Sequence, residues 1–145
     1  MNLIVAGGRD FKDYALLKSK LDFLLSNTDK EGVVILCGMA RGADLLGKQY
    51  ADENNMDVWE YPADWTKGKQ AGYLRNSQMA DDATHLVAFW DGVSKGTKHM
   101  IDLATKKGLV VRVYRYQVIG LIERSRDMTG ISNVRSETRQ RGVKT

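Results

Sequence analysis

The chain has little of several residue types, and each shortage excludes a class of protein. It contains one cysteine, one proline and two histidines among 145 residues. A lone cysteine, Cys37, cannot form an intramolecular disulfide, so we expect a small buried thiol in a protein of the reducing cytoplasm. One cysteine and two widely spaced histidines make no zinc pattern. We therefore expect no metal and no other cofactor.

Long apolar runs and the best-known catalytic motifs are also missing. No stretch is long enough to span a membrane, and the first apolar run begins so early that we expect no signal peptide. The sequence has neither G-x-G-x-x-G nor G-x-x-x-x-G-K-[ST], which argues against a standard dehydrogenase or P-loop NTPase. It also lacks the G-x-S-x-G turn of α/β-hydrolases.

Strong charge of one sign is confined to the end of the chain. The net charge is +4, and residues 123–145 hold six Lys/Arg against three acids, which accounts for +3 of it. The nearly neutral remainder argues against a broad nucleic-acid surface. We divide the chain into one globular domain, residues 1–122, and a basic polar tail, residues 123–145. The tail is either a solvated end or a nucleic-acid arm, and we favour the solvated end.

Short apolar runs alternate with amphipathic segments throughout the domain. The runs predict strands at Leu3–Ala6, Val33–Leu36, Asp57–Tyr61, His85–Trp90 and Leu109–Tyr114, with a further short strand or turn at 118–122. Helices are expected between them, one ending near Asn27, one ending near Asn54 and one at Tyr73–Asp82, with a fourth opened by Asp91–Thr97. This alternation predicts an α/β, Rossmann-like fold. Its sheet is doubly wound and mostly parallel, with about five strands in the order 3-2-1-4-5.

Three glycine-containing loops follow the first, second and fourth expected strands, at Gly7–Phe11, Gly38–Asp44 and Asp91–Thr97. In the predicted order the first and fourth strands are neighbours, so the loops meet at the carboxyl edge of the sheet, where such folds bind ligands. Two of the loops open helices, whose unpaired N–H groups suit an anion. We expect phosphates on the helix N-termini at Gly42 and Thr97.

Side chains on these loops suit a nucleotide. Arg9 and Arg41 offer planar, charged forks for phosphate. Asp44 either accepts a hydrogen bond from a ribose hydroxyl or is simply a favourable acid near a helix N-terminus. Trp65 either stacks on a base or covers apolar surface beside the only proline. Ser94 or Thr97 caps a helix at the place where a phosphate-binding hydroxyl would stand.

Together these motifs resemble the SLOG superfamily, specifically its YspA-like branch, from Gly7 to about Tyr114. The match is carried by Gly7-Gly8-Arg9-Asp10-Phe11, Gly38-Met39-Ala40-Arg41-Gly42-Ala43-Asp44, Asp64-Trp65, Gly68-Lys69-Gln70-Ala71-Gly72, Arg75-Asn76 with Met79-Ala80, and Gly92 with Gly96-Thr97. The resemblance implies a Rossmann-like fold and a ligand that is a nucleotide, a nucleotide sugar or an NAD/ADP-ribose derivative. It also implies a homo-oligomer, a dimer or larger.

The loops and the resemblance together give one set of expected ligand-binding residues. Trp65 or Phe11 is expected to pack on the base. The full set is Gly7, Gly8, Arg9, Asp10, Phe11, Gly38, Arg41, Gly42, Asp44, Trp65, Lys69, Arg75, Asn76, Gly92, Ser94, Gly96 and Thr97.

Two relatives within the superfamily suggest different activities. LOG-type phosphoribohydrolases use an arginine, matched here by Arg75, and a glutamate in P-G-G-x-G-T-x-x-E. Here Met100 stands at the glutamate position, and a thioether cannot supply the carboxylate that glycosidic cleavage needs. We therefore favour binding, as a sensor or sequestering protein of the kind thought to act in bacterial and phage conflict, over hydrolysis by Arg75 and Asp91. Single-stranded DNA binding of the DprA type needs a basic groove interleaved with aromatics and ranks third.

Overall fold

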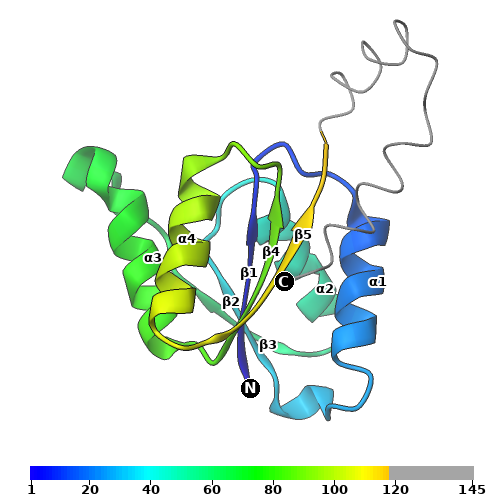
Figure 1. The fold of residues 1–145 in the computed structure, drawn as a ribbon. Helices are drawn as coiled ribbons and strands as arrows, with labels where there is room; N and C mark the ends of the chain where they lie inside the picture. Colours follow the sequence, from blue (N-terminus) through cyan, green and yellow to red (C-terminus); the bar gives the residue numbers. More distant parts are fainter. Residues whose placement is uncertain (118–145) are drawn as a thin grey trace, which may run out of the picture.

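Five strands form one parallel sheet in the computed structural model (Figure 1), which describes residues 1–117. They are β1 (Asn2–Gly7), β2 (Val34–Cys37), β3 (Asp57–Glu60), β4 (His85–Trp90) and β5 (Val110–Arg115). The order is β3-β2-β1-β4-β5 and each neighbouring pair is parallel, which confirms the prediction. The strand or turn predicted at 118–122 and the tail at 123–145 lie outside the described residues.

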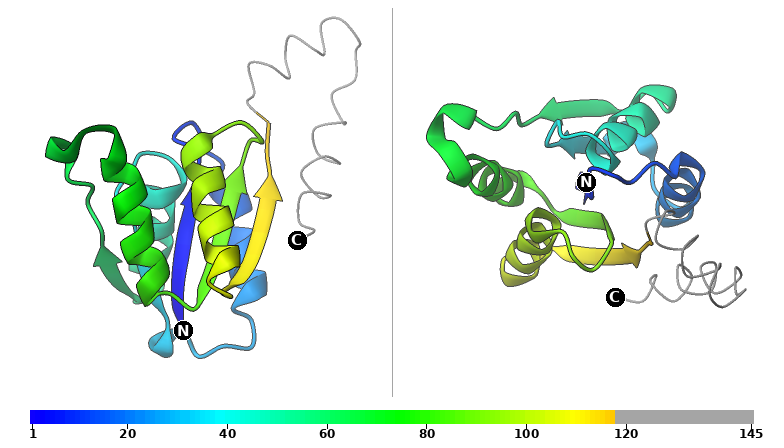
Figure 2. Two further views of the ribbon diagram at one scale, coloured as in Figure 1. Left: turned by 60° about the vertical axis from the view of Figure 1, so that its left-hand side comes forward. Right: turned by 90° about the horizontal axis from the view of Figure 1, so that it is seen from above.

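Helices cover both faces of the sheet. α1 (Tyr14–Leu24) and α2 (Ala43–Glu53) lie on one face, and α3 (Ala71–Asp82) and α4 (Lys95–Lys106) on the other (Figure 2). Short 3-10 helices, η1 (Lys30–Gly32) and η2 (Trp65–Gln70), lie in the connections. Within residues 1–117 no helix combines the length and the apolar content that crossing a membrane requires.

The alternation of side chains along β1 explains why both faces need a cover. Leu3 and Val5 join a buried cluster with Leu17 of α1, whereas Ile4 joins the opposite cluster with Met100 of α4. Successive residues of a strand point to opposite faces. The continuous apolar run of β1, Leu3–Ala6, must therefore be buried on both sides, as in parallel sheets flanked by helices.

Element boundaries differ from the predictions by a few residues. The first helix ends at Leu24 rather than near Asn27, since the N–H of Leu25 still bonds to Leu21 but Ser26 turns back to Phe23. The segment before α3, predicted as a loop, contains η2. Its start is fixed by Asp64, whose carboxylate accepts a hydrogen bond from the N–H of Thr66. This short helix presents the end of the loop towards the carboxyl edge of the sheet.

Candidate functional site

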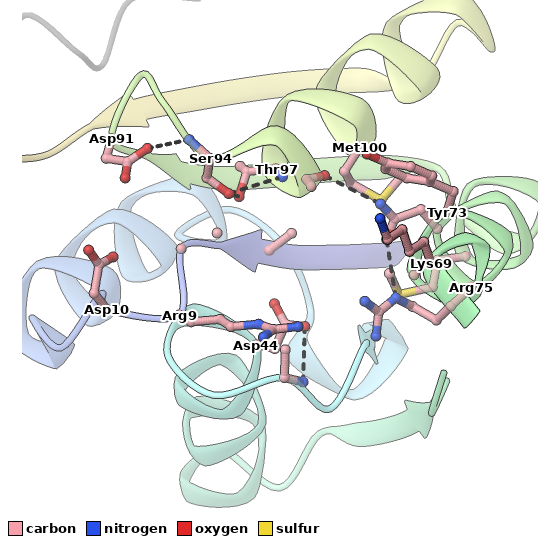
Figure 3. Close-up of a pocket in the computed structure, with 18 of the residues that line it drawn as sticks. Arg9, Asp10, Asp44, Lys69, Tyr73, Arg75, Asp91, Ser94, Thr97 and Met100 are labelled. Carbon is pink, nitrogen blue, oxygen red and sulfur yellow. Dashed lines mark hydrogen bonds between the residues drawn. The ribbon is translucent and has the colours of Figure 1, made fainter. Parts of the chain in front are cut away.

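A pocket of about 460 Å³ opens at the carboxyl edge of the sheet, beyond β1 and β4 (Figure 3). Its volume lies within the range of small-molecule sites. All three glycine-containing loops contribute, as predicted from the strand order. We call it the first pocket; it is lined by Ala6, Gly7, Gly8, Arg9, Asp10, Ala40, Asp44, Trp65, Lys69, Gly72, Tyr73, Arg75, Asn76, Met79, Asp91, Ser94, Gly96, Thr97 and Met100.

A second pocket of about 500 Å³ adjoins the first. The two share Arg9, Ala40, Trp65 and Arg75, so these residues form the boundary between them. The remaining lining of the second pocket comes from the turn after β2 and from the segment after β3. It consists of Gly38, Met39, Arg41, Pro62 and Ala63.

Asp44 is the buried acid of the first pocket. It lies in the first turn of α2, is 6% exposed, and its Oδ2 accepts a hydrogen bond from the N–H of Ala40 at 3.3 Å. Burial raises the pKa of this carboxyl to about 6, although the Ala40 N–H and the positive charges of Arg75 and Arg9 act in the opposite direction. Figure 3 shows the Arg9 side chain extending alongside Asp44. A buried carboxyl of raised pKa between two arginines, in a cleft, is typical of functional sites.

Arg75 connects the two pockets. It projects from α3, and its Nη1 donates a hydrogen bond to the carbonyl oxygen of Gly38, at the end of β2. Its Nε donates to Oδ1 of Asn76 at 3.2 Å. Arg75 is therefore held in place by two contacts and is not a freely solvated surface charge. A guanidinium fixed in this way is preorganised to meet an anion, because little of its freedom remains to be lost.

Asn76 ties α3 to the start of α4. Its side chain is 7% exposed, and Nδ2 donates to the carbonyl oxygen of Gly96 at 3.4 Å and lies 3.1 Å from Nδ1 of His99. The His99 ring packs against Tyr73, with ring centroids 4.4 Å apart. Burial lowers the pKa of His99, which favours the neutral ring. This group of side chains fixes one wall of the first pocket.

The two helix N-termini at this edge differ in how open they are. The α2 end is closed by the first loop, because the N–H of Ala43 donates to the carbonyl oxygen of Gly8 at 3.3 Å. Gly42, the N-cap with φ of 83°, lines neither pocket. The α4 end lines the first pocket. There Ser94 is the N-cap, and its hydroxyl accepts from the N–H of Thr97 at 3.4 Å.

Comparison with known proteins supports the resemblance seen in the motifs. Residues 1–68 match the model of the YspA, cpYpsA-related SLOG family. Over these residues, which are slightly less than half of the chain, the sequence is similar to the YspA-like branch of the SLOG superfamily. No curated protein and no solved structure matches the chain. The SLOG match includes the first two glycine-containing loops, and this similarity is consistent with a nucleotide-related binding or glycosidase-like role.

Most of the site residues expected from the sequence line the first pocket. Two line only the second pocket and three line neither pocket. Gly38 and Arg41 line only the second pocket, while Phe11, Gly42 and Gly92 line neither. Phe11 is 2% exposed and stacks on Phe89 with centroids 4.7 Å apart, so of the two residues expected to pack on a base, Trp65 or Phe11, Trp65 is the one that lines the pockets. Gly92 has a φ of 88°, and a Cβ there would collide with the Arg115 guanidinium; its role is in the turn.

Several lining residues were not expected from the sequence. Tyr73 and Gly72, at the start of α3, line the first pocket, and Met39 and Ala63 line the second. The one feature of the sequence that could have indicated Tyr73 as a lining residue is its position two residues before Arg75 on an expected helix. Nothing in the local pattern distinguished it from an ordinary surface tyrosine.

Proposed function

We propose that the chain binds a nucleotide-derived small molecule at the first pocket and acts as a sensor or sequestering protein. One observation carries this proposal. Arg9 and Arg75 flank the buried carboxyl of Asp44 at the switch point of a doubly wound sheet, beyond the ends of β1 and β4. Ligands of this fold bind at that point. The candidates are a nucleotide, a nucleotide sugar or an NAD/ADP-ribose derivative.

The lining suits the three parts of such a ligand. Arg9 and Arg75 offer bidentate donors to phosphate oxygens. Asp44, whose Oδ2 already accepts from Ala40, has acceptor capacity left for a ribose hydroxyl. Trp65, 61% exposed at the boundary of both pockets, and Tyr73 offer ring faces for a base.

Binding is favoured over hydrolysis by the side chain at one position of the first pocket. Met100 is 1% exposed and lines the pocket at the place where the LOG-type motif has its glutamate. Of the acids nearby, Asp91 uses Oδ1 to accept hydrogen bonds from the N–H groups of Val93 and Ser94, both at 2.8 Å. An acid engaged in a turn is poorly suited to assist an attacking water, which cleavage of an N-glycosidic bond requires.

Isothermal titration calorimetry of the full chain with AMP, ADP-ribose, NAD and a nucleotide sugar tests the proposal. We expect saturable binding of at least one of them, weakened tenfold or more in Arg75→Ala and partly restored in Arg75→Lys. Arg112→Ala is the control, because Arg112 is an exposed arginine of β5 that lines neither pocket. Thermal unfolding of each variant checks that it is folded.

Two outcomes would contradict the proposal. The first is no binding of any member of this panel at millimolar concentration. The second is release of free base at turnover, followed by chromatography and lost in Arg75→Ala, which would make the protein an N-glycosidic hydrolase.

A further inference from the structure

The two pockets differ in the charges that line them. The first pocket combines the cations Arg9, Lys69 and Arg75 with the carboxylates of Asp10, Asp44 and Asp91. The second is lined by the guanidinium-bearing Arg9, Arg41 and Arg75, and no acidic residue among residues 1–117 lines it. Three carboxylates line the first pocket, whereas behind the lining of the second lies the carboxylate of Asp44, which accepts a hydrogen bond from the N–H of the boundary residue Ala40. The second pocket is therefore electrostatically the better site for phosphate.

The start of α4 is a weaker phosphate site than the sequence indicates. Asp91 accepts hydrogen bonds from Val93 and Ser94 just before this helix, and the Ser94 hydroxyl accepts from Thr97. These bonds use part of the donor capacity at the turn. They also place a carboxylate beside the positive end of the helix dipole, where it offsets the attraction for a second anion.

The three arginines of the second pocket come from three different parts of the fold. Arg9 follows β1, Arg41 follows β2 and Arg75 lies on α3. Arg75 is fixed by the carbonyl oxygen of Gly38, which itself lines the pocket. In the described part of the chain Arg41 is exposed and has neither a hydrogen-bond nor an ion-pair partner, so its donors are open to a ligand.

We propose that the second pocket is a subsite for the diphosphate group of a nucleotide whose nucleoside lies in the first pocket. This inference rests on the proposed function and adds the class of ligand. A single phosphate carries a charge of about −1.5 to −2 at pH 7, less than three guanidinium groups can neutralise. A diphosphate matches them better, and its oxygens can meet more than one planar fork. The ligand crosses the boundary formed by Arg9, Ala40, Trp65 and Arg75, which both pockets share.

Calorimetric titration of the full chain with inorganic pyrophosphate, ADP and adenosine tests this subsite. We expect Arg41→Ala to weaken pyrophosphate and ADP at least tenfold and to leave adenosine unchanged, with partial recovery in Arg41→Lys. Arg112→Ala controls for the loss of one exposed positive charge elsewhere and should change none of the three. Arg41 is exposed and unpaired among residues 1–117, so its removal should not disturb folding.

The outcomes separate this subsite from the proposed function. Undiminished binding of pyrophosphate and ADP by Arg41→Ala, or an equal loss for adenosine, overturns the subsite even if nucleotides bind. Binding of pyrophosphate that depends on Arg41, when none of adenosine, ADP, AMP, ADP-ribose, NAD and the nucleotide sugar binds, supports an anion site but overturns both the nucleotide subsite and the proposed function. Absence of pyrophosphate binding by the wild-type chain overturns the subsite directly.

Discussion

Replacing Asp44 by asparagine should make the folded protein more stable at neutral pH. Burial raises the pKa of this carboxyl from 3.8 to about 6, which means that the folded environment favours its neutral form. At 1.36 kcal/mol per pKa unit, ionisation of Asp44 costs about 3 kcal/mol of folding free energy. Asparagine is neutral and nearly the same shape. Its amide oxygen can still accept the hydrogen bond from the N–H of Ala40.

The gain should depend on pH in a defined direction. Between pH 3.8 and about 6 the folded wild-type chain holds the Asp44 proton more tightly than the unfolded chain does. The free energy of unfolding of the wild type therefore falls as pH rises through this window. The free energy of unfolding of Asp44→Asn does not fall in this way, because asparagine has no proton to lose. Its advantage over the wild type should be about 1 kcal/mol at pH 4.5 and about 3 kcal/mol at pH 7.5.

Urea unfolding followed by circular dichroism at both pH values measures the difference. Asp57→Asn serves as control, because Asp57 is an exposed acid on the edge strand β3, and its effect should stay within about 0.5 kcal/mol. The reasoning is refuted if Asp44→Asn is no more stable than the wild type at pH 7.5. It is also refuted if the gain does not shrink at pH 4.5. Either result would mean that Arg9 and Arg75 hold the ionised carboxylate favourably.

Two further predictions concern single positions elsewhere in the fold. Cys37 is fully buried, and burial raises the pKa of its thiol to about 11. At pH 8 the thiol of the native protein should therefore react with a disulfide reagent at least about a hundredfold more slowly than the thiol of the protein unfolded in guanidinium. Equal reaction rates would contradict the burial. Gly42→Ala should destabilise by about 2 kcal/mol or more in urea unfolding, because φ is 83° and a Cβ would collide with the carbonyl oxygen of Gly8. Gly96→Ala, with open space around its Cβ in the first turn of α4, should be neutral or slightly stabilising, and equal losses at both glycines would count against this backbone geometry.

The strand order and the meeting of the three loops could be predicted because they follow from local patterns. Apolar runs such as Leu3–Ala6 and His85–Trp90 are short, continuous and separated by amphipathic segments, which leaves few parallel topologies. The glycines then mark the turns at the carboxyl edge. Register of β1 against β4 pairs Gly7 with Phe89 and puts the first and third loops side by side.

The contacts that build the site could not be predicted, because they join residues far apart in the chain. The hydrogen bond from Arg75 to Gly38 depends on where α3 passes the end of β2. The spacing of apolar residues along the sequence predicts the helix and the strand but not where they pass each other. Phe11 is an aromatic residue on a glycine-containing loop, as a residue that stacks on a base would be. In the structure its ring packs against Phe89 and belongs to the core. The Tyr116 hydroxyl donates to Asp10 at 2.6 Å and so fixes the first loop from beyond β5.

A nitrogen-15 heteronuclear NMR titration of the full chain with ADP-ribose tests the central claim most directly. We predict saturable shifts of the backbone amides of Gly8, Ala40, Asp44 and Gly96, at the carboxyl edge of the sheet. The amides of Gly32, Thr84 and Gly108, which adjoin the opposite ends of the strands, should not move. Shifts confined to those three amides, or no saturable shift at all, would contradict a nucleotide site at the switch point.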